Sequence, residues 1–544
     1  MSLKIALAQI DTLIGDFDNN LVKIKSNIDK AIELGADLVV FPELSICGYP
    51  PMDFLNFKDF VDKSIKKITE LATDYPNIGI IVGGPSINND PNGKDLFNSA
   101  YYLYEGSIRN VINKSLLPNY DVFDEYRYFQ QAYGNLCISH NNVRIALTIC
   151  EDIWNVNDNP LYTFIPMDEL NYYKPELAIN ISASPFSHSH NVDRIKVLQT
   201  NAKQFNIPFY YVNTIGAQTE LIFDGRSGVY FADGSYNQMS HINEELRIFD
   251  SSISSVEDVN LEYNKYRDIY SALIIGIKGY FKKLNFKTAI LGMSGGVDSA
   301  LVLALAYQAL GPENILPVLM PSEYSSLGSI DDSLDMIHRI GCDHKIIPIA
   351  NVFEELKTTM APHFGKKPED LTEENMQGRI RGIMLMALSN KLGNIVLNTS
   401  NKSELAVGYS TMYGDSIGAI SVIGDLYKTE VYELCRYINN EYNNIIPENI
   451  LNKEPSAELR PGQKDSDSLP SYNILDAILF QYIELERGPD EIVELGFDVE
   501  LVKKILKMVN RTEYKRFQAP PILRMSDKAF GSGRRIPIVA KYLE

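Results

Sequence analysis

The chain has 544 residues, 45% of them hydrophobic and 22% charged, which is the composition of a globular protein long enough for two or three domains. The formal net charge of −19 argues against long nucleic acid as the main partner, because phosphate backbones are bound by clustered Lys and Arg. No apolar run approaches the length of a membrane span, and the start of the chain lacks a signal-peptide pattern. The five cysteines form no C-x-x-C pair, so neither a zinc site nor a disulfide framework is indicated, and we expect a cytoplasmic protein.

The first half of the chain alternates short apolar strands with amphipathic helices. Helices are predicted at 21–34 and 60–72, and strands at 5–10, 38–41, 78–83, 98–104, 143–148, 177–181, 208–213 and 228–231. This alternation predicts an α/β domain covered by helices, to which we assign residues 1–245. Residues 246–262 are polar and acidic without a core periodicity, and we expect them to form a linker.

A second domain is expected over residues 263–544. It begins with a predicted helix at 263–284 and continues with strands at 288–291, 315–320, 345–349 and 395–399, with a helix at 380–392 between the last two. Strand, loop and helix repeat as in a doubly wound parallel sheet of the Rossmann-like type. In such sheets ligands bind at the carboxyl ends of the strands.

A glycine-rich turn connects the first strand of this second domain to a buried helix. Residues 291–299 read L-G-M-S-G-G-V-D-S, and Gly295 and Gly296 let the backbone turn sharply and approach a ligand. The unpaired N–H groups at the start of the helix favour an anion, so we expect a phosphate or pyrophosphate here. Asp298 would repel that anion unless a divalent cation lies between them. No Gly-Lys-Ser/Thr closes the loop, so this is not a Walker A motif.

Three reactive side chains of the first domain suit amide hydrolysis when they are taken together. Glu43 lies in F-P-E-L, Lys114 in N-K-S-L-L-P-N-Y, and Cys150 in T-I-C-E-D-I-W. Singly, each has a simpler explanation, as a solvated charge or a small core residue. Together, Glu43 would remove the thiol proton of Cys150, and Lys114 would lower the thiol pKa and stabilise an oxyanion.

These three contexts, in this order across residues 3–245, resemble the nitrilase, or carbon–nitrogen hydrolase, superfamily. The resemblance implies a nitrilase-like α-β-β-α sandwich with Glu43, Lys114 and Cys150 as catalytic residues. The stretch 121–129, D-V-F-D-E-Y-R-Y-F, resembles the glutaminase branch of the superfamily. It implies that glutamine is the substrate and that Tyr120 and Ser184 contact it. We add His190 to this set, because it stands six residues after Ser184, where Lys or Arg is usual in the family.

The turn at 291–299 resembles the PP-loop of ATP pyrophosphatases, which split ATP into AMP and pyrophosphate. Five further motifs accompany it in the second domain, at 373–381, 399–404, 409–415, 425–429 and 455–463. Together with the first domain they resemble the glutamine-dependent NAD synthetase family across nearly the whole chain. Asn398 is a small departure, because the family more often has Gly before T-S-N-K-S-E.

This second resemblance implies an amide-forming ligase. Ammonia released from glutamine would be transferred to deamido-NAD (nicotinic acid adenine dinucleotide), activated by ATP, to give NAD+, AMP and pyrophosphate. The resemblance also implies a homo-oligomer. The residues that it implies for ATP binding are Gly292, Met293, Ser294, Gly295, Gly296, Val297, Asp298, Ser299 and Thr399.

The acid to be amidated has its own implied residues, Asn375, Glu404 and Lys515. Lys515 lies in a basic stretch, 511–544, that contrasts with the acidic chain. Glu404 is also a candidate to share Mg²⁺ with Asp298, because hard cations bind carboxylate and phosphate oxygens.

Two alternatives remain open from the residues alone. Another ATP pyrophosphatase, such as a tRNA-modifying or nucleotide-amidating enzyme, would share the PP-loop but is not expected to carry the contexts at 401–404 and 456–460. A tRNA enzyme should also be less acidic. A non-catalytic nucleotide sensor would have no need for Glu43, Lys114 and Cys150 together.

Overall fold

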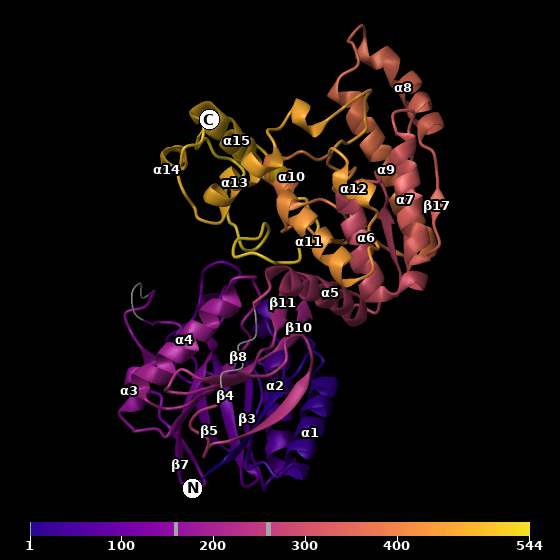
Figure 1. Cartoon of the computed structure of the whole chain (residues 1–544). Helices are drawn as coiled ribbons and strands as arrows, with labels where there is room; N and C mark the ends of the chain where they lie inside the picture. Colours follow the sequence, from indigo (N-terminus) through magenta and orange to yellow (C-terminus); the bar gives the residue numbers. More distant parts are fainter. Residues whose placement is uncertain (1, 157–160, 257–262, 544) are drawn as a thin grey trace. The chain divides into compact units, whose positions relative to one another are not determined.

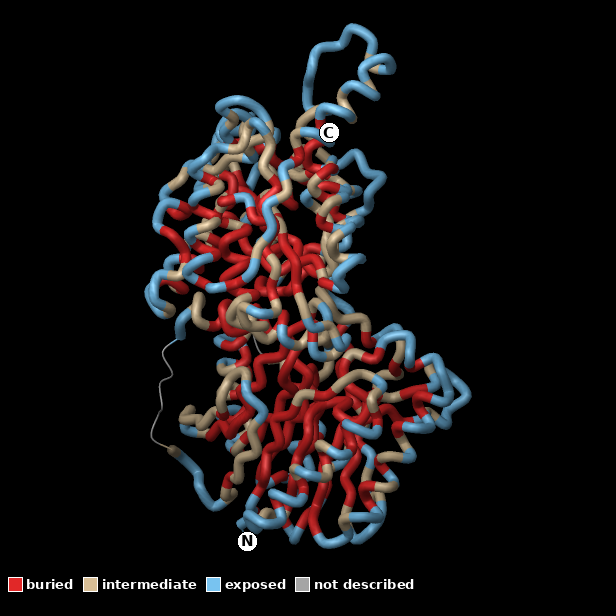
Figure 2. The backbone as a smooth tube through the Cα atoms, turned by 90° about the vertical axis from the view of Figure 1, so that its right-hand side faces the viewer, coloured by how far each residue is buried: buried red, intermediate tan, exposed pale blue. Residues whose placement is uncertain are grey.

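The computed structural model describes residues 2–156, 161–256 and 263–543, and the chain divides into two compact units, Met1–Tyr263 and Asn264–Glu544 (Figure 1). Each unit has its own buried interior, shown in red in Figure 2. The predicted α/β class is confirmed for both units, each of which is described by itself below.

Unit 1 is built from two sheets that face each other. The first has the strand order β14-β1-β2-β3-β4-β5 and the second β13-β12-β9-β8-β7-β6, with a separate hairpin β10-β11. The strands are β1 (Lys4–Gln9), β2 (Leu38–Val40), β3 (Gly79–Ile87), β4 (Leu96–Tyr104), β5 (Ser107–Asn113), β6 (Ile138–His140), β7 (Val143–Ile149), β8 (Leu177–Ser182), β9 (Phe209–Asn213), β10 (Ile215–Gln218), β11 (Leu221–Asp224), β12 (Gly228–Tyr230), β13 (Tyr236–Gln238) and β14 (Glu245–Asp250).

Helices cover the outer face of each sheet, which completes the expected α-β-β-α sandwich. The first sheet carries α1 (Phe17–Glu33) and α2 (Lys58–Asp74), whose apolar faces pack against β1–β4. The second sheet carries α3 (Pro166–Asn171) and α4 (His190–Phe205). A third apolar cluster lies between the sheets, so strands such as β1 and β8 are buried on both faces and are apolar almost throughout. Short 3₁₀ turns are η1 (Met52–Asn56), η2 (Glu125–Arg127) and η3 (Cys150–Ile153).

One strand lies where we expected linker. Residues 245–250 form β14, which pairs antiparallel with β1 from Glu245 opposite Gln9 to Asp250 opposite Lys4. Leu246 and Ile248 alternate with Glu245 and Arg247, but the strand is short and mostly half-buried, and it lies in a polar, acidic stretch of the sequence. The expectation of a linker from residue 246 is therefore wrong for this strand, and residues 257–262 of that linker lie outside the described part of the chain.

Unit 2 contains a parallel sheet with the strand order β17-β16-β15-β18-β19, as expected for a doubly wound fold. The strands are β15 (Ala289–Gly292), β16 (Ile315–Leu319), β17 (Lys345–Ile346), β18 (Ile395–Asn398) and β19 (Ile420–Ser421). The chain order reverses between β15 and β18, which is the place where such sheets bind ligands. The strand that we predicted at 345–349 is shorter than expected, because β17 ends at Ile346.

Helices pack on both faces of this sheet. α8 (Ala350–Phe364) and α9 (Leu371–Leu392) share a core with β15, β16 and β18. α6 (Val297–Leu310) contacts β15 and β16 and packs between α5 (Lys265–Lys283) and α11 (Lys428–Glu441). The remaining helices are α7 (Leu327–Ile340), α10 (Lys402–Val407), α12 (Glu448–Asn452), α13 (Tyr472–Ile483), α14 (Pro489–Glu494), α15 (Val499–Arg511) and α16 (Glu513–Arg516), with η4 (Pro312–Asn314) and η5 (Asp465–Asp467). None of the helices within the described residues is long and apolar enough to cross a membrane.

Candidate active sites

The centre of the first candidate site is a buried ammonium held by two carboxylates. Lys114 Nζ lies 2.7 Å from Glu43 Oε1 and 2.8 Å from both oxygens of Glu125. Asn98 Nδ2 donates to Glu43 Oε1 at 2.7 Å and to Glu125 Oε2 at 3.3 Å, and Tyr49 OH donates to Glu125 Oε1 at 2.9 Å. Lys114 and Glu43 are inaccessible to solvent, so this network fixes both side chains.

Cys150 is presented by a sharp turn at the end of β7. Its φ is +42°, in the left-handed region that a residue with a Cβ adopts only under constraint. Asp152 supplies the constraint, because its carboxylate accepts from the N–H of Ile149 at 3.0 Å, of Ser115 at 2.9 Å and of Leu116 at 2.8 Å. One carboxylate therefore ties the Cys150 turn to the backbone that directly follows Lys114.

Charge and burial around Cys150 keep the thiol protonated at rest. Burial and the Glu43 carboxylate raise the pKa of Cys150 well above its usual value, and the opposing effect of Lys114 is smaller. Burial lowers the pKa of Lys114, but Glu125 and Glu43 outweigh it and hold the ammonium charged. A base is thus needed when the thiol reacts, and the Glu43 carboxylate is part of the same cluster.

Tyr120, one of the residues expected to contact glutamine, bonds to a second buried carboxylate. Its hydroxyl donates to Glu151 at 2.9 Å, and the hydroxyl of Tyr162 donates to the same oxygen at 3.1 Å. Glu151 directly follows Cys150, and burial raises its pKa to about 7 despite these bonds. Tyr120 is 40% exposed, whereas Glu151 is only 3% exposed.

Ser184 and His190, the other two expected glutamine contacts, are direct neighbours. Ser184 Oγ lies 2.9 Å from His190 Nε2, and the Ser184 N–H donates to Asn213 Oδ1 at 2.8 Å. The imidazole of His190 stacks on Trp154, with ring centroids 4.7 Å apart and an interplanar angle of 12°. The preceding Ala183 N–H donates to Glu43 Oε2 at 2.9 Å, which links this pair to the Lys114 cluster.

The second candidate site is a pocket of about 300 Å³ in unit 2, at the carboxyl ends of β15 and β18. Gly295 has φ +80°, and a Cβ there would lie 2.3 Å from Ser329 O, so only glycine fits this turn. Gly295 itself does not line the pocket. The other residues expected to bind ATP do line it, namely Gly292, Met293, Ser294, Gly296, Val297, Asp298, Ser299 and Thr399.

Asp298 and Glu404 meet at one buried ammonium. Lys428 Nζ lies 2.5 Å from Asp298 Oδ2 and 3.2 Å from Glu404 Oε1. Asn401 Nδ2 donates to Asp298 Oδ1 at 2.8 Å, and Asn401 Oδ1 caps α10 by accepting from Glu404 N at 3.0 Å. Burial raises the pKa of Glu404 to about 8, Lys428 opposes this shift, and Asp298 and Asp465 add to it. Two carboxylates share one ammonium at this position, so the position suits an additional cation.

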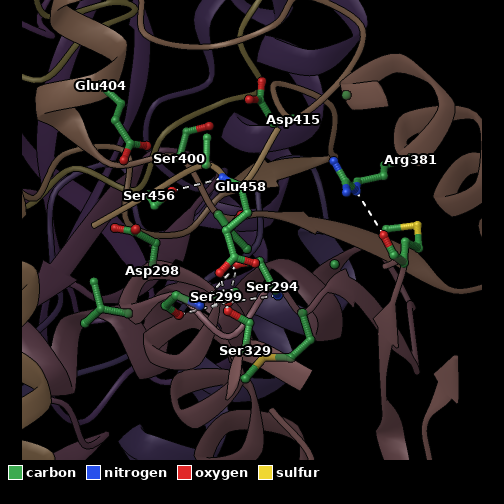
Figure 3. Close-up of a pocket in the computed structure, with 18 of the residues that line it drawn as sticks. Ser294, Asp298, Ser299, Ser329, Arg381, Ser400, Glu404, Asp415, Ser456 and Glu458 are labelled. Carbon is green, nitrogen blue, oxygen red and sulfur yellow. Dashed lines mark hydrogen bonds between the residues drawn. The ribbon is translucent and has the colours of Figure 1, made fainter. Parts of the chain in front are cut away.

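A loop closes one side of this pocket through Glu458. Its carboxylate accepts from Ser326 Oγ at 2.8 Å and from Ser329 Oγ at 2.7 Å, and Ser326 is the N-cap of α7. Lys453 Nζ lies 3.7 Å from the same carboxylate. Figure 3 shows Glu458 reaching toward Ser329, beside Ser294 of the PP-loop. The loop 453–465 is thus held beside the part of the pocket that the PP-loop lines.

Asn375 and Lys515 lie behind the pocket wall rather than in it. Asn375 Oδ1 accepts from Thr411 Oγ1 at 2.8 Å, and Lys515 Nζ donates to Gly408 O at 2.7 Å and to Ser410 O at 2.8 Å. Ser410 and Thr411 line the pocket, whereas Asn375 and Lys515 do not. In this structure both residues therefore brace the pocket-lining loop.

Sequence reasoning missed three residues that complete these sites: Glu125, Lys428 and Glu458. Each lies inside a motif that the sequence had singled out, at 121–129, 425–429 and 455–463. No local pattern distinguishes them from solvated charges, because their partners are distant in the chain. Burial distinguishes Glu125 and Lys428 from solvated charges, because these residues are only 6% and 3% exposed.

Two family models match the chain in succession: carbon–nitrogen hydrolase at residues 4–259 and NAD synthase at residues 269–519. Fold and sites thus define an enzyme class in which a carbon–nitrogen hydrolase unit is joined to an NAD synthase unit. The chain is 43% identical to a glutamine-dependent NAD(+) synthetase of Synechocystis over 99% of both chains, and 39% identical to that of Thermotoga maritima over 100% and 99%. The structure of glutamine-dependent NAD+ synthetase from Acinetobacter baumannii in complex with ADP is also similar, with 37% identity, a TM-score of 0.78 and 99% of both chains covered. The chain belongs to the glutamine-dependent NAD(+) synthetase family.

Proposed function

We propose that this protein makes NAD+ by hydrolysing glutamine in unit 1 and amidating deamido-NAD with ATP in unit 2. The observation that carries the proposal is the presence, in one chain, of the buried Glu43–Lys114–Cys150 set and of a pocket lined by the PP-loop. A nucleotide sensor would need only the pocket. Glutamine amide hydrolysis supplies the ammonia that an activated carboxylate consumes.

In unit 1, Glu43 takes the thiol proton as Cys150 attacks the side-chain carbonyl of glutamine. The Lys114 ammonium stabilises the negative charge that develops on the carbonyl oxygen, and Glu125 holds that ammonium in place. Glu43 then returns the proton to the departing nitrogen, ammonia leaves, and water hydrolyses the thioester to glutamate. Tyr120, Ser184 and His190 form the glutamine subsite in this proposal, and Glu151 adds a carboxylate to it.

In unit 2, the nicotinate carboxylate of deamido-NAD attacks the α-phosphate of ATP, and pyrophosphate leaves. The PP-loop receives the pyrophosphate through backbone N–H groups at the start of α6. Ammonia then displaces AMP from the acyl-adenylate and forms the amide of NAD+. Glu404 borders the pocket from α10, whereas Asn375 and Lys515 act on deamido-NAD through the loop 408–411 that they brace.

The carboxylates of Asp298 and Glu404 are the candidate Mg²⁺ ligands, because both line the pocket beside the PP-loop and both contact the same ammonium, that of Lys428. In the described part of the chain, no group of three or more His, Cys, Asp or Glu side chains could hold a metal ion. The protein would therefore hold Mg²⁺ by Asp298 and Glu404, with phosphate oxygens of ATP completing the shell. When bound, the ion neutralises charge on the leaving pyrophosphate.

The proposal includes a cytoplasmic homo-oligomer. The proposed cytoplasmic location is supported by the cysteines, because all five are free. The proposed homo-oligomer rests on the family resemblance.

The direct test is product analysis. Purified protein receives ATP, Mg²⁺, deamido-NAD and glutamine, and NAD+, AMP, pyrophosphate and glutamate are quantified. The proposal expects the four products in equal amounts. Glutamate without NAD+, together with AMP bound to another acceptor, would identify a different ATP pyrophosphatase.

A further inference from the structure

The feature of unit 2 that the proposed reaction leaves unexplained is a fully buried ammonium, that of Lys402. Lys402 is the first residue of α10, and its side chain is completely inaccessible to solvent. It lies two positions before Glu404, and residues two apart on a helix do not share a face. Lys402 is not among the pocket-lining residues, whereas Glu404 is.

Lys402 joins three segments that are far apart in the chain. Its Nζ lies 2.8 Å from Asp425 Oδ1, in the loop that precedes α11, and contacts the carboxylate of Glu484 at the end of α13. It also donates to Ser526 Oγ at 2.8 Å and to Lys528 O at 3.0 Å. All of these partners lie in unit 2 and all are largely buried where they meet Lys402.

Residues 521–528, which we call the C-terminal strap, are held by the same carboxylates. Asp425 Oδ2 accepts from the N–H of Met525 at 2.7 Å and of Ser526 at 2.6 Å, and Glu484 Oε2 accepts from Lys528 N at 3.0 Å. Ile522 extends the sheet through a parallel bridge to Ser421 of β19. The NAD synthase match ends at residue 519, so it does not include the strap.

Two neighbours of Lys402 on the same helical turn connect it to the pocket: Glu404 lines the pocket, and Asn401 contacts the pocket-lining Asp298. Asn401 donates to Asp298 Oδ1 at 2.8 Å, and Glu404 Oε1 lies 3.2 Å from Lys428 Nζ. The backbone N–H of Lys402 donates to Leu426 O at 2.8 Å, so the turn is also fixed from the side. A shift of this turn would move the Glu404 carboxylate relative to the PP-loop and would break the hydrogen bond between Asn401 and Asp298.

Buried ion clusters add little net stability, because taking charges out of water costs about as much as their attraction returns. Such a cluster instead favours one arrangement of the chain segments that form it, because its hydrogen bonds form only when the acceptors are correctly placed around the ammonium. Here the cluster has four acceptor positions around one ammonium, directly behind the turn that carries Glu404.

We propose that Lys402 is a positioning residue: with Asp425 and the C-terminal strap, it fixes the first turn of α10 and thereby places Glu404 at the nucleotide pocket and Asn401 against Asp298 of the PP-loop. The inference deepens the proposed function and rests on it only in assigning ATP to this pocket.

The test uses the full-length enzyme with Lys402→Met and Ser526→Ala, and with Lys528→Ala as the matched control. The control removes the half-buried side chain of Lys528, whose Nζ pairs with Glu486, and keeps the backbone carbonyl by which Lys528 meets the cluster. The ATP dissociation constant is measured by calorimetry, together with the KM for ATP and kcat of ammonium-driven NAD+ formation, the melting temperature and glutaminase activity.

We expect the ATP dissociation constant and KM to rise at least tenfold in Lys402→Met and several-fold in Ser526→Ala. Lys528→Ala and the glutaminase activity of all variants should stay within twofold of the unmodified protein. ATP affinity within twofold of the unmodified protein in Ser526→Ala overturns the proposal, whether or not Lys402→Met folds. A lowered melting temperature with unchanged ATP affinity also overturns it, because that is the result of a purely stabilising role. If the unmodified protein binds ATP but makes no NAD+, the proposed function fails while the affinity comparison still decides the role of Lys402.

Discussion

Lys428 Nζ lies 2.5 Å from Asp298 Oδ2, so the aspartate of the PP-loop is paired with an ammonium from α11 that follows it by 130 residues. The same ammonium reaches Glu404 Oε1 at 3.2 Å and is only 3% exposed. Burial lowers the pKa of Lys428, but Asp298 and Glu404 outweigh it and raise the pKa above its usual value, so the residue is charged at neutral pH. Lys428 thus sets the resting charge of the pocket that we assign to ATP.

Replacing Lys428 by Met should abolish NAD+ synthesis from either nitrogen source, with a loss of about 100-fold or more, because two partly buried carboxylates would lose the ammonium that they share. Glutaminase activity should persist. Lys265→Met is the matched control. It removes a partly exposed ion pair with Glu430, which lies on α11 like Lys428, and it should change NAD+ synthesis little. Ammonium-driven synthesis that survives Lys428→Met would remove this residue from the pocket's function.

Glu125→Gln should lower glutaminase kcat by roughly 10- to 100-fold, because Lys114 would lose the carboxylate that holds it beside Glu43. Ammonium-driven synthesis should not change. Tyr49→Phe serves as the comparison, since it removes one hydrogen bond to Glu125 without removing the charge. Equal effects of the two substitutions on glutaminase kcat would show that the charge of Glu125 does not matter.

The contribution of Glu151 to the stability of the protein should fall as the pH rises from about 5 to 8. Burial raises the pKa of Glu151 to about 7 from the ordinary 4.5, so the folded state binds this proton more tightly than the unfolded state. The stabilisation is fully present below pH 4.5 and is lost as the pH passes 7; each pKa unit corresponds to about 1.4 kcal/mol. Melting temperatures measured across this range should depend less on pH in Glu151→Gln. An unchanged pH dependence would contradict the buried, proton-binding role of Glu151.

Glu458→Ala should release the loop 453–465 from α7, because the acceptor for Ser326 and Ser329 is lost. We expect limited proteolysis within this loop to become several-fold faster and the KM for ATP to rise. Glu454→Ala is the proteolysis control in the same loop, since it breaks an exposed pair with Lys464 and leaves the bonds of Glu458 to Ser326 and Ser329 in place. Equal proteolysis rates in the two variants would show that Glu458 does not fasten the loop.

Much of the fold followed from periodicity in the sequence, because strands such as β8 and β15 are short, mainly apolar runs. Boundaries were less accurate: α1 starts at Phe17, four residues before the expected start, because Asp16 caps it by accepting from Asn19 N. β14 escaped prediction because it is only half-buried and takes its register from β1, more than 200 residues away.

The residues of the candidate sites also fall into two groups, those that the sequence indicates and those that only the folded structure shows. Glu43, Lys114, Cys150 and the PP-loop have distinctive local contexts, so the sequence indicates them without any knowledge of packing. Lys428 and Lys402 act through partners from distant segments, and only the folded chain shows that they are buried cations rather than solvated ones. Long-range pairing of this kind has no one-dimensional signature.

The central claim is a division of labour between the two units, and Cys150→Ala tests it most directly. NAD+ formation is measured with ATP, Mg²⁺ and deamido-NAD, with either glutamine or ammonium as the nitrogen source. Cys137→Ala, a half-buried cysteine of the same unit, is the control. The account predicts that Cys150→Ala loses synthesis from glutamine and keeps synthesis from ammonium, whereas Cys137→Ala keeps both. Equal loss from glutamine and ammonium in Cys150→Ala would contradict it.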